Sequence, residues 1–325
     1  MPKMKTEIQP PTGKKARDLS LDRFRGLAII LMVIVNDLAD AEGIPAVLLH
    51  PEDKGFSLAD IVAPMFIFAI ACSFRQSYLR RRERDRAAAG PHFVTRYLAI
   101  LGIGAIFTGF ENAALGGGDW GALQSIGVAG LLALLAVNLP AWGRALAGGC
   151  GLVVYQVLNA TVLRGMIFGF DHGGLFGALG YGCMLILGTV MIDLWRKGLK
   201  AYLAGTGVLC LLAACSLFVV DISKNRVSLS FVLVSLAICG AAWLAFNLLE
   251  KALPKKSGLI AWWGENPMLL YVLHLGGVGL CRLPFMVLGM EPRPLYFALP
   301  LDLLLLAVLS LAAWRLHRKG KRIAL

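Results

Sequence analysis

The chain has 325 residues, of which 58% are hydrophobic and only 16% are charged, and its mean hydropathy is +0.70. Soluble domains are about half apolar and a quarter charged, so this composition excludes an ordinary soluble protein and indicates a polytopic membrane protein. The formal net charge of +12 would suggest a nucleic-acid partner in a soluble protein. Here the basic residues gather at the ends of apolar segments, where they set membrane topology, and we expect no nucleic-acid partner.

The seven cysteines lie in or beside apolar segments and show no CxxC spacing. They are typical of small residues in a membrane interior, so we expect neither a disulfide framework nor a bound metal. Residues 1–17 are polar and lack the short apolar core and cleavage site of a signal peptide. We expect a disordered cytoplasmic tail over 1–17, followed by a single transmembrane domain over 18–325.

Ten segments are long and apolar enough to cross a bilayer, which needs about 20 mostly apolar residues. They predict an all-α polytopic membrane protein with about ten transmembrane helices. The expected helices lie at about 20–38, 57–78, 93–111, 121–139, 144–163, 174–194, 200–220, 227–248, 259–281 and 296–316.

The distribution of lysine and arginine predicts the orientation of these helices. If the N-terminus is cytoplasmic, 26 of the 32 basic residues fall on the cytoplasmic side. The remaining six fall on the outer side: Lys54, Arg164, Lys224, Arg226, Arg282 and Arg293. This bias predicts that both termini are cytoplasmic. No internal repeat relates the two halves of the chain, which disfavours an inverted-repeat transporter.

The first two apolar segments form a hairpin, 18–72, whose first helix carries polar residues in unusual places. Ser20 is a candidate N-cap, and Asp22 suits the first turn of a helix. Arg23 and Arg25 lie at the cytoplasmic end. There they either follow the topology rule or hold an anionic group such as a phosphate.

The outer half of this hairpin carries the first candidates for chemistry. Asn36 lies about 16 Å along a helix from Arg25, where an amide either bonds another helix or faces a cavity. His50 lies in the loop and is either simply solvated or a general base or nucleophile, because an imidazole titrates near neutral pH. Ser57 and Asp60 form an S-x-x-D capping pattern, and Pro64 is expected to kink the helix that follows.

Three later stretches carry further polar residues. Gln124 and Ser125 open the fourth helix, where they are available for polar contacts. Asp171 and His172 precede a glycine-rich helix. This pattern indicates a turn and a helix cap, and the glycines suit close helix packing.

The last of these stretches is WWGENPMLLYVLHL, which places Asn266 at a helix start. His274 follows about one-third of the way into the membrane. An ionisable residue at that depth is either functional or neutral and hydrogen-bonded between helices, and we favour the second reading.

These motifs resemble those of the heparan-alpha-glucosaminide N-acetyltransferase family, whose bacterial members are polytopic. The resemblance begins with SLDRFRGLAIILMVIVN, the loop with its histidine, and GFSLADIVAPMFIF. It continues through ALQSIGVAGLL, DHGGLFGALGYGCMLILGTVM, SKNRVSLSFVLVSLAICG and GENPMLLYVLHL, and so covers nearly the whole chain in order. The resemblance implies a multi-pass protein of the bacterial inner membrane. It implies transfer of an acetyl group from cytosolic acetyl-CoA to an amino sugar or other glycan on the far side.

The resemblance also implies roles for individual residues. His50 occupies the place of the family's catalytic histidine, and Asn36 matches an asparagine at the end of the first helix. The set expected to bind the substrate or CoA consists of Arg25, Arg23, Asp22, Asp60, Gln124, Asp171, His172, Asn266 and His274. The chain departs from the family pattern in three places: Ser125 replaces an arginine, the usual aromatic residue after the histidine is missing, and Ala63 replaces a phenylalanine.

A mechanism follows from these assignments. Arginines at the inner face hold the phosphates of CoA while the thioester arm extends outward between helices. His50 then deprotonates an acceptor amine or hydroxyl, or takes the acyl group itself, and Asn36 donates to the thioester carbonyl. Two other functions stay open: a transporter or flippase for a sugar conjugate or amphiphile, and a non-catalytic membrane scaffold. A homodimer is compatible with each.

Overall fold

The computed structural model describes residues 18–39, 41–115, 120–167, 169–252, 257–290 and 292–323. The predicted tail over 1–17 lies outside this part of the chain. The described part is helical and contains no β-strand, with one isolated bridge between Ala41 and Arg293. Its α-helices are α1 (Leu19–Leu38), α2 (Val62–Arg84), α3 (Arg86–Leu115), α4 (Ala122–Ala136), α5 (Ala141–Ala160), α6 (Arg164–Ile167), α7 (Gly174–Lys197), α8 (Leu199–Ser216), α9 (Leu229–Ala252), α10 (Leu259–Glu265), α11 (Pro267–Val287) and α12 (Leu295–Arg318). Short 3-10 helices add η1 (Ala46–Leu48), η2 (Ala59–Ile61) and η3 (Asp171–Gly173).

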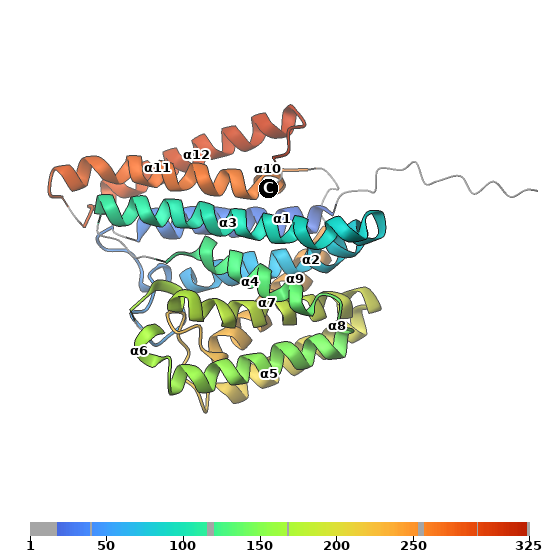
Figure 1. Cartoon of the computed structure of the whole chain (residues 1–325). Helices are drawn as coiled ribbons and strands as arrows, with labels where there is room; N and C mark the ends of the chain where they lie inside the picture. Colours follow the sequence, from blue (N-terminus) through green and yellow to red (C-terminus); the bar gives the residue numbers. More distant parts are fainter. Residues whose placement is uncertain are drawn as a thin grey trace, which may run out of the picture.

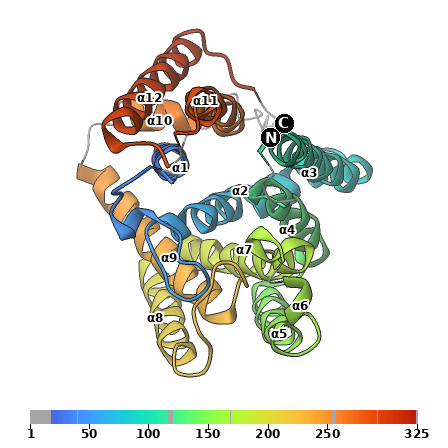
Figure 2. The same ribbon diagram turned by 90° about the vertical axis from the view of Figure 1, so that its left-hand side faces the viewer.

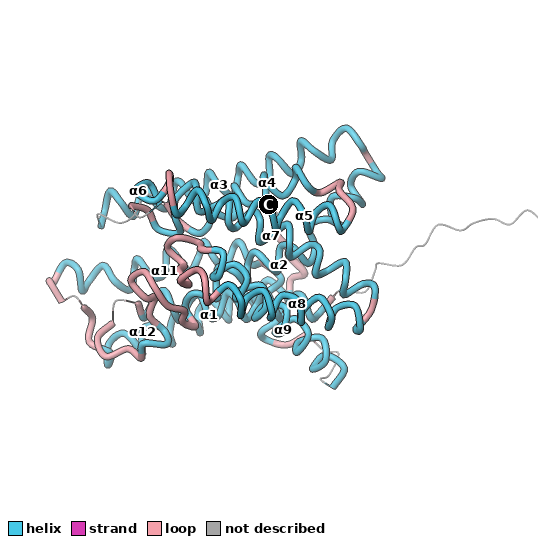
Figure 3. The backbone as a smooth tube through the Cα atoms, turned by 90° about the horizontal axis from the view of Figure 1, so that it is seen from below, coloured by secondary structure: helices cyan, strands magenta, loops and turns pink. Residues whose placement is uncertain are grey.

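The prediction of an all-α polytopic membrane protein is confirmed. Seven helices in the described part are long and apolar enough to cross a bilayer, namely α2 with η2, α3, α7 with η3, α8, α9, α11 and α12. The helices α1, α4 and α5 run alongside them in Figure 1. Apart from the short α6, each described α-helix overlaps one of the ten segments expected from the sequence, and α10 and α11 share the segment 259–281. Figure 3 shows the same helical backbone from another side, with its longer loops at the helix ends.

Several expected helix boundaries are wrong for local reasons. Asp18 caps α1, because its Oδ1 accepts a hydrogen bond from the main chain of Leu21 at 3.2 Å, and Ser20 already lies inside the helix. Pro64 lies in the first turn of α2, where a missing N–H is tolerated, so it causes no kink in the helix interior. The expected helix over 259–281 is broken at Asn266, and Pro267 begins α11.

The helices form a larger group around α7 and a smaller group made of α10, α11 and α12. The end-on view in Figure 2 shows α1 between the two groups. In its most apolar stretch α7 is 72% buried and α2 is 67% buried, whereas α11 is 17% buried. Helices α7 and α2 therefore form the protein core, while α11 presents most of its apolar surface outward, as a lipid-facing helix does.

Glycines bring helices close together, as the glycine-rich sequence predicts. A Cβ atom on Gly26 of α1 would lie 1.8 Å from the carbonyl oxygen of Ile260, and one on Gly264 of α10 would lie 1.8 Å from that of Asp22. On α7, a Cβ on Gly182 would lie 2.7 Å from the side chain of Leu132 on α4. Only a residue without a side chain allows these backbones to approach so closely.

Candidate active site

A histidine and a buried carboxylate meet at the end of the molecule that carries the α1–α2 loop. The Nδ1 atom of His50 lies 2.7 Å from Oδ1 of Asp60. The Asp60 side chain is 1% exposed, whereas the His50 side chain is 35% exposed. A carboxylate on Nδ1 fixes the tautomer of an imidazole and leaves Nε2 able to accept a proton. The geometry therefore suits general-base chemistry at an accessible site.

The capping pattern predicted around Asp60 is also present. Its Oδ2 accepts hydrogen bonds from the main chain of Ser57 at 2.9 Å and from the Ser57 hydroxyl at 3.3 Å. The same hydroxyl accepts a bond from the main chain of Ala59 at 3.1 Å. Capping and contact with His50 are thus two functions of one carboxylate. The loop has no regular periodicity, so the sequence alone predicts the capping and not the contact.

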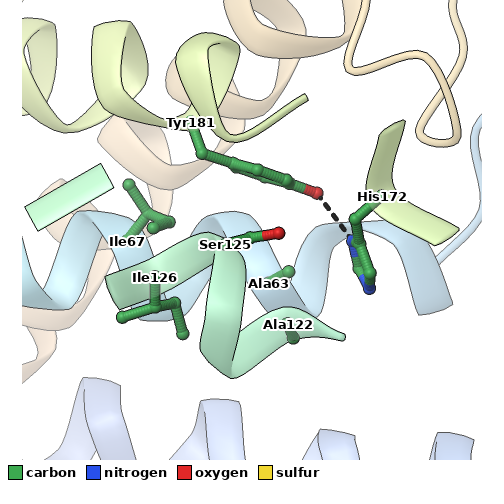
Figure 4. Close-up of a pocket in the computed structure, with 7 residues that line it drawn as sticks. All are labelled: Ala63, Ile67, Ala122, Ser125, Ile126, His172 and Tyr181. Atoms are coloured by element: carbon green, nitrogen blue, oxygen red, sulfur yellow. Dashed lines mark hydrogen bonds between the residues drawn. The ribbon is translucent and has the colours of Figure 1, made fainter. Parts of the chain in front are cut away.

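A narrow pocket lies between α2, α4, η3 and α7 (Figure 4). Its lining consists of Ala63, Ile67, Ala122, Ser125, Ile126, His172 and Tyr181. The Tyr181 hydroxyl lies 3.0 Å from Nδ1 of His172. His172 is within electrostatic range of His50, and Tyr181 is within range of Asp60. Two of the positions that depart from the expected family pattern, Ala63 and Ser125, line this pocket.

The polar residues at the other end of α1 separate into different environments. Arg23 forms an ion pair with Glu250 at the end of α9. Arg25 donates hydrogen bonds to α2, to the hydroxyl of Ser73 at 2.9 Å and to the carbonyl of Ala69 at 3.5 Å. Asp22 lies in the first turn of α1, as predicted, and is buried against α10. Of these three residues of α1, Arg25 is therefore the one whose side chain contacts α2.

Asn36 lies on the same face of α1 as Arg25. Eleven residues at about 100° each bring the chain round to within about 20° of its starting direction. The main-chain carbonyl of Asn36 accepts a hydrogen bond from Arg282 at 2.5 Å. Its side-chain amide is half-buried and forms no hydrogen bond with a described residue, His50 included. The amide thus remains able to donate to a substrate.

A second set of buried polar groups lies at the C-terminal end of α1, where the loop between α11 and α12 is attached, and the sequence did not predict this contact. Arg293 is fully buried, donates a hydrogen bond to the main chain of Asp37, and lies 3.6 Å from its Oδ1. His274 is also fully buried, with its ring 6.2 Å from that of Tyr271. Neither ring nitrogen of His274 has a hydrogen-bond partner in the described part, so the hydrogen bond expected between helices is wrong.

Two more of the expected binding residues connect helices. Gln124 accepts a hydrogen bond from the main chain of Gly121 at 2.7 Å and donates one to Thr108 at 2.9 Å, which joins α4 to α3. Asn266 accepts a bond from the main chain of Ile323 at 2.8 Å and donates one to the carbonyl of Lys321 at 3.2 Å. Asp171 is exposed at the start of η3. The structure therefore groups His50, Asp60 and His172 and leaves Gln124 and Asn266 in structural contacts.

Comparison with known families identifies the kind of protein that carries this site. The sequence model described as "Heparan-alpha-glucosaminide N-acetyltransferase, catalytic" matches residues 17–179, half of the chain. The chain belongs to this family. The resemblance seen in the sequence is thereby confirmed, and the protein is a membrane acetyltransferase. No curated protein matches the chain.

The matched segment contains most of the candidate site. It runs from the start of α1 into α7 and includes His50, Asp60 and His172. Membership in an acetyltransferase family favours a transferase over a transporter or a scaffold. The α8–α9 loop and the smaller helix group lie beyond the match.

Proposed function

We propose that the protein transfers an acetyl group from cytosolic acetyl-CoA to an amino sugar at the outer side of the membrane, with His50 as the general base. The observation that carries this proposal is the hydrogen bond between His50 and the buried carboxylate of Asp60 at the end with the α1–α2 loop. Membership in the acetyltransferase family supplies the reaction class.

Direct transfer of the acetyl group to the acceptor uses two side chains of the protein, those of His50 and Asn36. Nε2 of His50 takes a proton from the acceptor nitrogen as that nitrogen bonds to the thioester carbon. The carbonyl electrons move to the acyl oxygen, and the amide of Asn36 donates a hydrogen bond to it. When the carbon–sulfur bond breaks, its electron pair goes to sulfur, which takes the proton from His50. The products are the acetylated amine and the CoA thiol.

One face of α1 supports an acyl-CoA site that spans the bilayer. Arg25 lies toward the cytoplasmic end of this face and is suited to a phosphate oxygen of CoA, because guanidinium groups bind phosphate strongly. Asn36 lies about 16 Å farther along the same face. A donor that lies along α1 would therefore present its thioester at the outer end.

The charges at the outer end favour an amine acceptor. Acidic side chains gather on the outer loops and short helices there. Arg226 and Lys54 neutralise Asp53 and Asp221, but Glu52, Asp60 and Asp171 form no ion pair with a lysine or arginine in the described part. Such surroundings attract an ammonium group, which must lose a proton before it attacks the thioester. We therefore propose N-acetylation of an amino sugar, in the bacterial inner membrane, with both termini cytoplasmic as the basic residues indicate.

Purified protein in lipid nanodiscs tests this proposal, with acetyl-CoA as the donor and glucosamine as the acceptor. Wild type is expected to release CoA, and His50→Ala is expected to lose activity by about 10²–10⁴-fold. Asn36→Ala is expected to lose about 10²–10³-fold in kcat. A wild type that neither binds acetyl-CoA nor releases CoA with amino-sugar acceptors would contradict the transferase. Normal turnover by His50→Ala would contradict only the proposed role of His50 and would leave the transferase reaction itself standing.

The same material distinguishes direct transfer from an acyl-histidine intermediate. Protein incubated with radiolabelled acetyl-CoA and no acceptor is expected to stay unlabelled if transfer is direct. Label on the wild type and its loss in His50→Ala would establish the covalent route.

A further inference from the structure

The loop that carries His50 is fastened to a segment far away in the sequence. Asp53 Oδ1 accepts hydrogen bonds from the hydroxyl of Ser223 and from Nε of Arg226, both at 2.9 Å. The side chain of Asn225 donates to the carbonyl of Glu52 at 2.6 Å. This segment, residues 221–228 between α8 and α9, lies beyond the matched family region. In Figure 2 the two loops lie beside each other over α9.

Two further contacts complete this attachment. The main chain of Gly55 donates to the carbonyl of Ile222 at 2.9 Å, and Lys54 pairs with Asp221 at 2.7 Å. The hydrogen bond from Lys54 holds the pKa of the Asp221 carboxyl below its usual range. The α8–α9 loop thus holds the His50 loop through both main-chain and side-chain bonds.

The α8–α9 loop is itself held in an unusual conformation. Val227 has a φ of +47°, which is rare for a β-branched residue, and His172 in the adjacent η3 has a φ of +55°. The carbonyl of Arg226 accepts bonds from Tyr155 at 2.6 Å and Asn159 at 3.1 Å. Such conformations persist only where the surrounding structure holds them, and they cluster at functional sites.

Lys224 is the side chain that this loop brings to the site. Asp60, Asp171 and His172 all lie within electrostatic range of its ammonium group. The ammonium group of Lys224 nevertheless forms neither a hydrogen bond nor an ion pair with any residue that the structure describes, although the main-chain carbonyl of Lys224 accepts a hydrogen bond from Val227. Burial lowers the pKa of Lys224 below its usual value, and the two carboxylates offset part of this effect. A desolvated cation without a partner is ready to bind negative charge.

We propose that Lys224 is a further catalytic residue, whose ammonium group donates a hydrogen bond to the acyl oxygen as negative charge develops there. This inference rests on the proposed acetyl transfer. Two donors, Lys224 and the amide of Asn36, then share the oxygen, as donors commonly do in acyl-transfer sites. The bond to the oxygen is strongest while the tetrahedral intermediate exists and weakens when the carbonyl re-forms. No proton passes through Lys224, so the overall balance of the transfer is unchanged.

The variants Lys224→Met and Lys224→Arg test the inference in the nanodisc assay with acetyl-CoA and glucosamine. A donor that acts in the transition state is worth about 10²–10³-fold in kcat, so Lys224→Met is expected to lose that much. The KM for acetyl-CoA is expected to change by less than about threefold, because a donor that acts only in the transition state does not contribute to binding of the substrate. Arg164→Met is the matched control, because it removes another outer cation that is exposed on α6.

The pH profile gives a readout that a structural role would not produce. The groups around Lys224 that carry or gain charge are His50, Asp60, Asp171, His172, Asp221 and Arg226. Because the lysine must be protonated to donate, wild-type kcat is expected to fall as the pH rises through its lowered pKa. In Lys224→Arg the guanidinium keeps its proton, so the fall is expected at higher pH, with part of the activity restored.

Three results would overturn the inference. They are a kcat of Lys224→Met within twofold of wild type, a raised KM for glucosamine with unchanged kcat, and an alkaline limb that Lys224→Arg does not move. If Lys224→Met does not fold, as judged by its melting temperature, the pH profile of Lys224→Arg decides alone. An inactive wild type would instead contradict the proposed acetyl transfer.

Discussion

At the scale of single residues, the pairing of His50 with Asp60 determines what the site can do. The carboxylate has three polar contacts, with the histidine at 2.7 Å, the main chain of Ser57 at 2.9 Å and the Ser57 hydroxyl at 3.3 Å, and together they keep it in place. A buried carboxylate also stabilises the imidazolium that forms when Nε2 takes a proton. With His50 as the proposed base, we infer that Asp60 acts as a positioning residue for it; binding of the substrate or CoA by Asp60 stays a prediction.

Replacing Asp60 by asparagine tests this role. An amide in place of the carboxylate lets the imidazole adopt the wrong tautomer, so we expect kcat to fall by about 10²–10⁴-fold. Because the amide oxygen can still accept from Ser57, the melting temperature should change by only a few degrees. The measurement is kcat beside thermal unfolding. Loss of folding together with loss of activity would show that capping is the main role of Asp60.

The sequence allowed part of this site to be predicted. Local patterns point to His50 as a loop histidine and to Ser57 and Asp60 as a cap, because both depend on residues close in the chain. The contact of Asp60 with His50 and the approach of Lys224 depend on tertiary structure. No spacing in the sequence encodes them.

At the scale of elements, α1 is held between two groups of helices by close backbone contacts. Gly26 faces α10 and Gly264 faces α1, each where a Cβ would lie 1.8 Å from a carbonyl oxygen. The break at Asn266 is what makes α10 a separate short helix that can cross α1. Hydrophobic periodicity runs through the break, so the sequence predicted one helix where the structure has two.

Gly26→Ala tests whether this contact holds α1 in place. The added methyl group meets backbone, which yields little, so we expect a loss of about 1–3 kcal/mol in the free energy of unfolding. Gly102→Ala on α3 is the matched control, because a Cβ there meets nothing within 4 Å. The control should be neutral or more stable by about 0.5–1 kcal/mol. Equal melting temperatures for the two variants would contradict the contact.

At the scale of the whole molecule, composition and charge already indicate the fold class and the orientation. Apolar length predicted about ten crossing helices, because each must span the same bilayer thickness, and seven helices in the described part are long and apolar enough to do so. The arrangement of those helices around α7, and the position of α1 between two groups, follow from side-chain packing. Composition contains no information about that packing.

The orientation can be measured in intact cells with a thiol reagent that does not cross membranes. Arg164 and Lys197 are exposed cations at opposite ends of the bundle. Arg164→Cys is expected to react from outside, and Lys197→Cys is expected to react only after the cells are permeabilised. Wild type, whose own cysteines lie in or beside apolar segments, gives the background. The reverse labelling pattern would place His50 in the cytoplasm.

The attachment of the His50 loop also bears on the order of events as the chain is made. Ser223, Asn225 and Arg226 follow their partners by 170 to 173 residues. A growing chain that has inserted its first two helices therefore has its histidine and its carboxylate, but the loop has no anchor. Contacts so distant in sequence form late, because the intervening chain must first be ordered. Catalytic competence in this protein is thus expected to be one of the last features to arise during its synthesis, after the segment recognised as catalytic is complete.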